Sequence, residues 1–179
     1  MSAEARPDAG PRRPVTTCHC AVSSTGAGPN AAVVALVGAP NSGKSTLFNA
    51  LTGARQKVGN YPGVTVERHA GHLQLPHLGE VDLVDLPGSY SLTPASPDEE
   101  VARNVLLGTQ AGEKRPDALI IVVDAGNLAQ HLRFVFELRA LGIPTIVALN
   151  MVDMAQRDGL TLDAARLSRE LGVPVVPTV

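Results

Sequence analysis

The chain has 179 residues, 44% of them hydrophobic, and a formal net charge of −2 at pH 7. This length suits one domain, and the apolar content excludes a chain that is disordered throughout. The near-neutral charge gives no sign of a nucleic-acid partner, and no apolar run reaches the roughly 18 residues that a membrane span needs.

The first thirty residues differ in composition from the rest. Residues 1–30 are rich in Pro, Gly, Ala, Ser and Thr and lack apolar periodicity, so we expect a disordered tail without a secretory signal. Cys18-His19-Cys20 supplies three soft ligands in a row, which leaves transition-metal binding open. The usual Cys-x₂-Cys spacing and a fourth ligand are missing, so a plain tail is the favoured interpretation.

From residue 31 onward, short apolar runs alternate with helical patterns. Strands are predicted at 31–37, 67–75, 81–85, 118–124, 145–150 and 173–176. Helices are predicted from Thr46 to a stop at Gly53, over 97–107, from Asn127 to Gly142 and over 161–171, with a loop over 54–66. Continuous apolar strands between helices indicate an α/β fold, with a mostly parallel sheet covered by helices on both faces.

A phosphate-binding motif follows the first predicted strand. Its residues are Gly38, Ala39, Pro40, Asn41, Ser42, Gly43, Lys44 and Ser45, which match G-x-x-x-x-G-K-[ST], with Thr46 opening the next helix. The two glycines let backbone N–H groups surround a phosphate. Lys44 adds charge at the β- and γ-phosphates, and the Ser45 hydroxyl is a Mg²⁺ ligand. A chance glycine-rich turn is the alternative, which the flanking strand and helix disfavour.

A second motif, D-x-x-G, follows the strand at 81–85. It consists of Asp85, Leu86, Pro87 and Gly88. Asp85 is suited to hold Mg²⁺ through water, and the Gly88 N–H to reach a γ-phosphate. Thr65, in the loop after the first helix, is placed to add a hydroxyl to Mg²⁺ when the γ-phosphate is present. In a parallel sheet these strand ends share one edge, so we expect the motifs to converge there.

A third motif, N-x-x-D, follows the strand at 145–150. It consists of Asn150, Met151, Val152 and Asp153. A carboxylate accepts two hydrogen bonds side by side, and guanine, unlike adenine, offers two adjacent donors, so Asp153 is predicted to select guanine. Each short motif is weak alone, but their order along the chain predicts a site for GTP or GDP with Mg²⁺.

Longer stretches resemble one family. Residues 58–67 and 85–92 look like the switch regions of the prokaryotic ferrous iron transporter B (FeoB) family, and 124–128 and 171–177 are similar too. The resemblance implies a Ras-like P-loop GTPase domain with Gly63 and Val64 beside Thr65 at the nucleotide. It also implies a helical spacer and a polytopic Fe²⁺-transporting region downstream, which would place this domain at the cytoplasmic face of the bacterial cell membrane.

The chain departs from that family's pattern at both ends. It stops at Thr178-Val179, where a short Ser/Ala-rich fifth guanine motif should follow. We therefore expect residues 31–179 to be a G domain truncated before that motif. The tail of residues 1–30 is also longer than the family's usual start.

The rate of hydrolysis is expected to be slow. The position after D-x-x-G, where Ras-like enzymes carry a water-orienting Gln, is Ser89, which is too short for that role. Lys44, Thr65, Gly88 and Asn41 are the predicted catalytic residues. Asn41 matches the asparagine that helps to hold K⁺ in potassium-stimulated members of the family; the alternative is that it only shapes the loop.

Two other functions stay open from the sequence. One is a soluble bacterial GTPase of ribosome or RNA maturation, which the near-neutral charge disfavours. The other is a nucleotide-binding module without turnover, since no catalytic Gln is present. In a GTPase, residues 55–66 and 88–97 are predicted to move between the diphosphate and triphosphate states.

Overall fold

The computed structural model describes residues 31–53, 56–76 and 79–179. The predicted tail, with Cys18-His19-Cys20, lies outside the described residues. Within them, no helix has both the length and the apolar character that crossing a bilayer requires.

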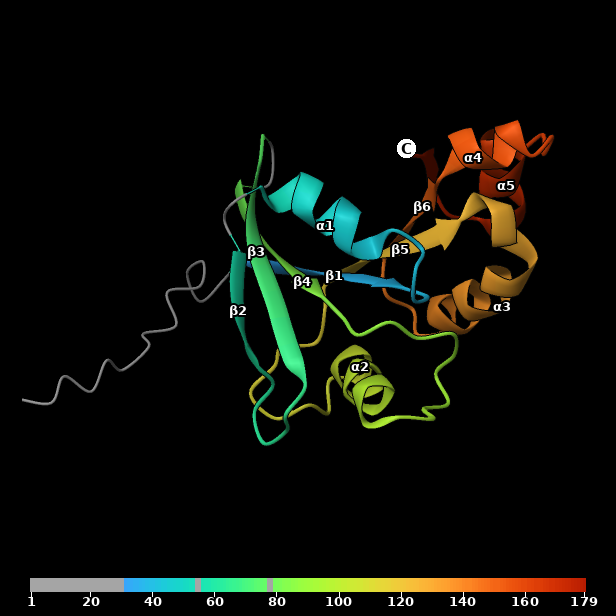
Figure 1. The fold of residues 1–179 in the computed structure, drawn as a ribbon. Helices are drawn as coiled ribbons and strands as arrows, with labels where there is room; N and C mark the ends of the chain where they lie inside the picture. The colour runs from blue at the N-terminus through green and yellow to red at the C-terminus, as the bar shows by residue number, and fades with distance from the viewer. Residues whose placement is uncertain (1–30, 54–55, 77–78) are drawn as a thin grey trace, which may run out of the picture.

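The described residues form one mixed sheet of seven strands, in the order β2-β3-β4-β1-β5-β6-β7 (Figure 1). The strands are β1 (Ala32–Gly38), β2 (Gln56–Asn60), β3 (Glu67–Leu75), β4 (Gly79–Asp85), β5 (Ala118–Asp124), β6 (Thr145–Asn150) and β7 (Val175–Pro177). β4, β1, β5, β6 and β7 run parallel, while β2 and β3 pair antiparallel at one edge. The parallel part brings the ends of β1, β4 and β6 to one edge, as the three motifs require.

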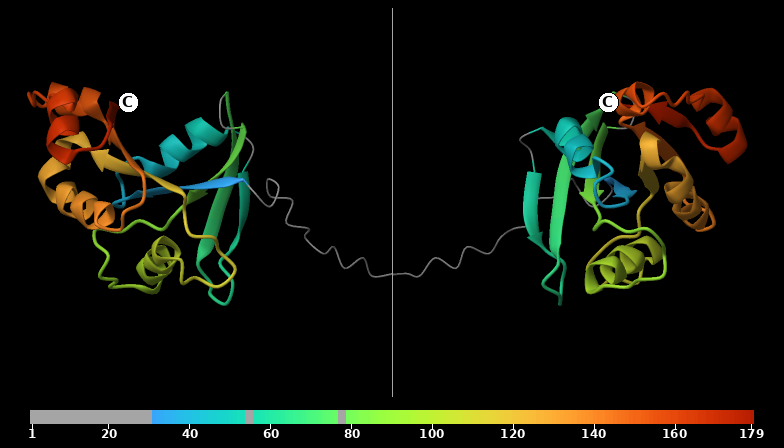
Figure 2. Two further views of the ribbon diagram at one scale, coloured as in Figure 1. Left: turned by 180° about the vertical axis from the view of Figure 1, so that it is seen from behind. Right: turned by 45° about the vertical axis from the view of Figure 1, so that its right-hand side comes forward.

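Helices lie on both faces of this sheet (Figures 1 and 2). They are α1 (Lys44–Thr52), α2 (Pro97–Leu107), α3 (Leu128–Arg139), α4 (Val152–Arg157) and α5 (Ala164–Leu171), with a 3₁₀ turn η1 (Ala125–Asn127) before α3. α1 covers one face by seating Phe48 against Leu36, Leu83 and Val122. α2 and α3 cover the other face, where alternate residues of β1, β4, β5 and β6 form the larger core. The central strands are therefore apolar on both sides, which explains their continuous apolar runs.

The helix α2 follows its predicted bounds. Ser96 caps it by accepting a hydrogen bond from the Glu99 N–H at 3.3 Å, and Pro97 occupies the first turn. It ends at Gly108, whose φ of 74° is a left-handed conformation that glycine adopts without strain.

The sequence prediction differs from the structure at three elements. Residues 56–60 were predicted as loop but form β2, an exposed edge strand with Val58 63% exposed, so it needs no apolar alternation. β2 forms through backbone hydrogen bonds to β3. The helix predicted over 161–171 begins at Ala164, where Asp163 caps it, and the short α4 was not predicted. Six residues are too few to show a helical period.

Candidate functional site

The phosphate loop between β1 and α1 is packed too tightly for larger residues at its glycines. A Cβ on Gly38 would lie 2.6 Å from the Val122 carbonyl oxygen, and one on Gly43 would lie 2.1 Å from Asn150 Nδ2. Gly43 and Asn41 have positive φ values of 81° and 64°. The loop is therefore a backbone cradle, as an anion site needs.

The D-x-x-G segment lies directly against this cradle. Lys44 Nζ forms an ion pair with Asp85 Oδ1, and both side chains are largely buried. The Leu86 N–H donates to the Leu36 carbonyl at 3.0 Å, which continues the pairing of β4 with β1. A Cβ on Gly88 would lie 3.0 Å from Pro40 Cγ. The first two motifs thus form one surface.

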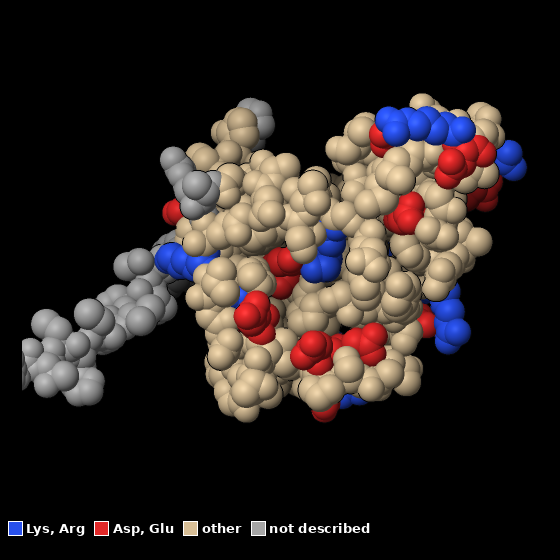
Figure 3. Space-filling model, viewed as in Figure 1, with Lys and Arg blue, Asp and Glu red and all other residues tan. Residues whose placement is uncertain are grey.

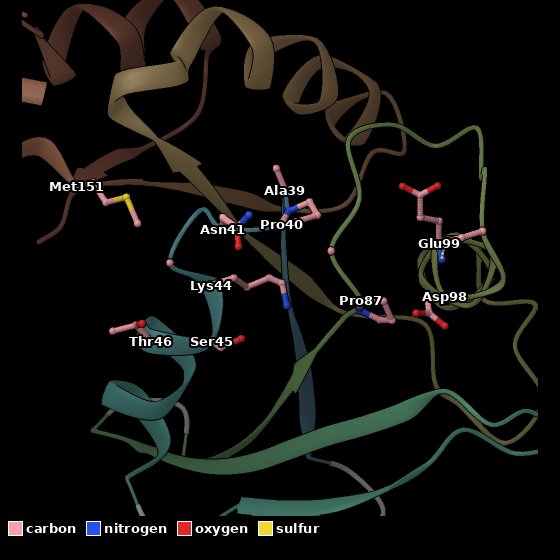
Figure 4. Close-up of a pocket in the computed structure, with 13 residues that line it drawn as sticks. Ala39, Pro40, Asn41, Lys44, Ser45, Thr46, Pro87, Asp98, Glu99 and Met151 are labelled. Carbon is pink, nitrogen blue, oxygen red and sulfur yellow. Dashed lines mark hydrogen bonds between the residues drawn. The ribbon is translucent and has the colours of Figure 1, made fainter. Parts of the chain in front are cut away.

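Two adjoining cavities open on this surface. The larger, of about 810 Å³, is lined by Ala39, Pro40, Asn41, Gly43, Lys44, Ser45, Thr46, Pro87, Gly88, Ser96, Asp98, Glu99 and Met151 (Figure 4). The smaller, of about 390 Å³, is lined by Lys44, Ser45, Thr65, Val66, Glu67, His69, Asp85, Leu86, Pro87 and Asp98. Lys44 and Ser45 line both, so the cavities share the end of the phosphate loop. Hydroxyl and carboxylate oxygens thereby face one space, which is the donor set that Mg²⁺ prefers.

Asn150 supports the cradle and does not line either cavity. Its Nδ2 donates to the Ser42 carbonyl at 3.0 Å, and its Oδ1 accepts from the Thr178 hydroxyl at 3.0 Å. Ser42 is itself buried, with its hydroxyl donating to the Ala39 carbonyl at 2.8 Å. Asn150 and Ser42 therefore support the phosphate loop from inside the protein. Ser42 was predicted to contact the nucleotide, but it does not line either cavity.

Asp153 and Met151 both follow β6, but only Met151 lines a cavity. Met151 has a positive φ of 59° and lines the larger cavity. Asp153 is in the first turn of α4, outside both linings, where Arg157 Nη2 lies 3.2 Å from its Oδ2. The Asp153 side chain is 36% exposed, so it remains accessible to a ligand.

The loop after β2 is only partly at the site. Thr65 is exposed and lines the smaller cavity with Ser45 and Asp85. Gly63 and Val64, predicted beside it, are exposed and do not line either cavity. The structure thus brings Thr65 to the same cavity as Ser45 and Asp85 but leaves its two predecessors at the surface.

Sequence reasoning missed the start of α2 as part of the site. Ser96, Asp98 and Glu99 line the larger cavity, and Asp98 lines both. Figure 3 shows acidic side chains over α2 beside the hollow between α1 and α2. From the sequence, this segment is predicted only to begin the helix over 97–107. Their position within ten or so residues of D-x-x-G was the available signal.

Ser89 and His131 turn into the protein beside the site. The Ser89 hydroxyl donates to the Ser91 carbonyl at 2.7 Å, and Ser89 is only 2% exposed. Burial lowers the pKa of His131, while nearby Asp124 raises it to a smaller extent. His131 Nδ1 accepts a hydrogen bond from the Asp124 N–H at 3.0 Å, which requires that nitrogen to be unprotonated.

The chain resembles known iron-transport proteins over nearly all of its described length. The family model of ferrous iron transport protein B matches residues 32–179. The Fe(2+) transporter FeoB of Salmonella typhimurium is 51% identical over 150 residues, which are 82% of this chain and 19% of that protein. The Escherichia coli (strain K12) transporter is 49% identical, with the same coverage. The chain therefore spans about a fifth of the length of these curated relatives.

Solved structures with this fold include G domains and cytosolic domains of FeoB proteins. The T. maritima G domain is 42% identical with a TM-score of 0.73, over 82% of this chain and 86% of that one. A mutant S. thermophilus domain bound to mGDP is 45% identical with a TM-score of 0.75, over 83% and 54%. The fold is thus the predicted P-loop, Ras-like one, and the iron-transporter interpretation is favoured over ribosome or RNA maturation. The chain belongs to the ferrous iron transport protein B family.

Proposed function

We propose that this chain binds GTP and GDP at the two adjoining cavities and hydrolyses GTP slowly, as the switch domain of a bacterial Fe²⁺ transporter. The proposal rests on one observation. The Lys44–Asp85 ion pair joins the phosphate loop to the D-x-x-G segment, and Ser45 and Thr65 line the same smaller cavity as this pair. GDP-bound relatives of the same fold support a guanine nucleotide.

The proposal extends to the rest of the transporter. The curated relatives are Fe(2+) transporters about five times as long as the matched segment. We therefore propose that residues 31–179 are a G domain whose fifth guanine motif, helical spacer and membrane region follow in the full protein. The domain would then work at the cytoplasmic face of the cell membrane.

Base recognition is assigned to Asp153. Its carboxylate, half-exposed at the start of α4, would exchange the Arg157 partner for the two adjacent guanine donors. Asn150 connects the end of β6 to the phosphate loop through the Ser42 carbonyl, and Asp153 follows it three residues later. Met151, which lies between Asn150 and α4 with a positive φ, is one of the residues that line the larger cavity.

Phosphate and metal handling is assigned to the residues of the smaller cavity. Lys44 and the loop N–H groups would bind the phosphates, while Ser45, Thr65 and Asp85 would hold Mg²⁺, Asp85 through water. Mg²⁺ bound there would neutralise part of the phosphate charge. Because Asp85 is paired with Lys44 in the structure, nucleotide binding must separate these two side chains.

A slow intrinsic rate follows from Ser89. Its hydroxyl is used inside the D-x-x-G loop by the Ser91 carbonyl, so it is not available to orient a water. Asn41, exposed at the larger cavity beside Lys44, is proposed as a K⁺ ligand (Figure 4). K⁺ held there would supply positive charge near the transferred phosphoryl group.

Calorimetric titration with GDP and ADP tests the proposal on the wild type, Asp153→Ala and Arg157→Gln. Asp153→Ala should weaken GDP binding by about 1–3 kcal/mol, because the base donors lose their acceptor. Arg157→Gln removes only the ion-pair partner of Asp153 and should leave GDP binding intact. Equal GDP affinity in the wild type and Asp153→Ala, or equal binding of ADP by the wild type, would contradict the assignment.

A further inference from the structure

We infer that residues 108–116, between α2 and β5, form a latch that positions Thr65. We call them the latch loop, and residues 61–66 the Thr65 loop. Gly112 and Glu113 are then positioning residues for the Thr65 hydroxyl. The role of Thr65 itself rests on the proposed function, but the latch is a property of the fold.

The Thr65 loop is a closed turn built on Tyr61. The Tyr61 N–H donates to the Val66 carbonyl at 3.0 Å, and the Val64 N–H donates to the Tyr61 carbonyl at 3.2 Å. The Tyr61 side chain is 1% exposed and packs in the larger core, although its hydroxyl has no hydrogen-bond partner among the described residues. The two ends of the Thr65 loop are therefore fixed, and with them the backbone on either side of Thr65.

The latch loop contacts the Thr65 loop at Pro62. Gln110 Nε2 donates to the Pro62 carbonyl at 3.5 Å. Gly112 has a φ of 74°, and a Cβ there would lie 3.0 Å from Pro62 Cγ. The latch loop therefore approaches Pro62 so closely that a side chain at position 112 would clash with it.

A second contact lies on the other side of Thr65. Arg68 Nε, three residues after Thr65 in β3, lies 2.6 Å from Glu113 Oε1. The Glu113 side chain is only 10% exposed and that of Arg68 30% exposed, so the pair is largely sheltered from solvent. Such charge-assisted bonds are stronger than neutral ones. Thr65 is therefore held between two points, Pro62 and Arg68, that the same loop contacts.

The latch loop is itself fixed to the end of α2. The Thr109 N–H donates to the Asn104 carbonyl at 2.8 Å, and Arg115 Nε donates to the Leu106 carbonyl at 3.4 Å. Arg115 Nη2 also donates to the Leu141 carbonyl, just after α3, at 3.0 Å. The other end of α2 carries Asp98, which lines both cavities. One helix thus connects the nucleotide cavities to the element that holds Thr65, so a shift of α2 would act on the Thr65 loop.

The first test is hydrogen exchange of the nucleotide-free chain, with two variants and two matched controls. Glu113→Gln removes the ion pair with Arg68, while Lys114→Gln removes the neighbouring pair with Asp117, which does not contact the Thr65 loop. Gly112→Ala adds backbone strain and a clash with Pro62. Gly142→Ala adds similar strain at φ 69° with nothing within 4 Å.

Residues 61–68 should exchange about tenfold faster in Glu113→Gln than in Lys114→Gln, as the loss of one charge-assisted bond predicts. They should also exchange faster in Gly112→Ala than in Gly142→Ala, because the added methyl group must displace Pro62. The exchanged pair Arg68→Glu with Glu113→Arg should restore slow exchange. Equal exchange in the variants and their controls overturns the latch.

The second test is GTP turnover of the same proteins against Mg²⁺ concentration. Glu113→Gln should raise the Mg²⁺ needed for half-maximal turnover while leaving GDP affinity unchanged, since Thr65 contributes only with the γ-phosphate. An unchanged Mg²⁺ requirement overturns the positioning role. A wild type without turnover contradicts the proposed function, and the exchange experiment still decides the latch.

Discussion

A Cβ atom placed on Gly43 would come within 2.1 Å of the Asn150 side-chain nitrogen, although 107 positions separate the two residues. The same Asn150 nitrogen donates to the Ser42 carbonyl at 3.0 Å. The phosphate loop and the N-x-x-D segment are therefore in direct contact, and the contact requires glycine at position 43. A substitution of Gly43 or Asn150 should therefore affect both the phosphate loop and the N-x-x-D segment.

Gly43→Ala should abolish GDP binding, because the new methyl group must displace Asn150 or the loop. Strain at φ 81° adds about 1–2 kcal/mol. Gly142→Ala is the control, since its φ of 69° is also positive and a Cβ there meets nothing within 4 Å. Calorimetry and thermal unfolding measure both effects. Normal GDP binding by Gly43→Ala would show that the loop tolerates a side chain.

Asp85→Asn should have opposite effects with and without Mg²⁺. Lys44 loses its ion-pair partner and becomes free for phosphate, so GDP affinity without Mg²⁺ should stay the same or rise. The gain in GTP-analogue affinity on adding Mg²⁺ should fall by about tenfold or more. Asp82→Asn, in the same strand but bonded to His72, is the control. A Mg²⁺ gain equal to that of the wild type would remove Asp85 from the metal site.

GTP turnover should rise when K⁺ replaces Na⁺ at constant ionic strength, and Asn41 should be needed for that rise. Asn41 has a φ of 64°, so Asn41→Gly removes the side-chain oxygen without strain, whereas Asn41→Ala adds strain. Arginine fingers increase such rates about 10³–10⁵-fold, and a loosely held monovalent ion should give less. K⁺ stimulation that persists in Asn41→Gly would limit Asn41 to shaping the loop.

Stability should fall as the pH is lowered below the ordinary histidine pKa of about 6.5. Burial lowers the pKa of His131 in the folded chain, so below that pH the unfolded chain binds a proton that the folded chain does not. His131→Gln keeps an acceptor for the Asp124 N–H but cannot titrate, and it should flatten this part of the curve. Denaturant unfolding between pH 5.5 and 7.5 measures the change; an identical pH dependence in His131→Gln would exclude His131 as its source.

The sequence by itself determined the alternating fold and the positions of the three motifs. Apolar runs ending at Val37, Asp85 and Asn150 predict buried parallel strands, and such strands place their carboxyl ends on one edge whatever the details of packing. The residue types of each motif then indicate its chemistry. In the phosphate loop, for example, glycines, a lysine and a hydroxyl are the residue types that bind phosphate and Mg²⁺. Lys44, Ser45 and Asp85 were found in this way, and the structure brings them to one cavity with Thr65, which was predicted from its place in the loop after the first helix.

Only the tertiary structure decided which neighbours complete and hold that site. Asp98 reaches both cavities because α2 packs beside the cradle, and Thr178 bonds Asn150 because β7 lies next to β6. Glu113 meets Arg68 across 45 positions, and β2 forms through backbone bonds that leave no side-chain pattern. Such contacts depend on the distance between packed elements, a quantity that local propensity and periodicity do not contain.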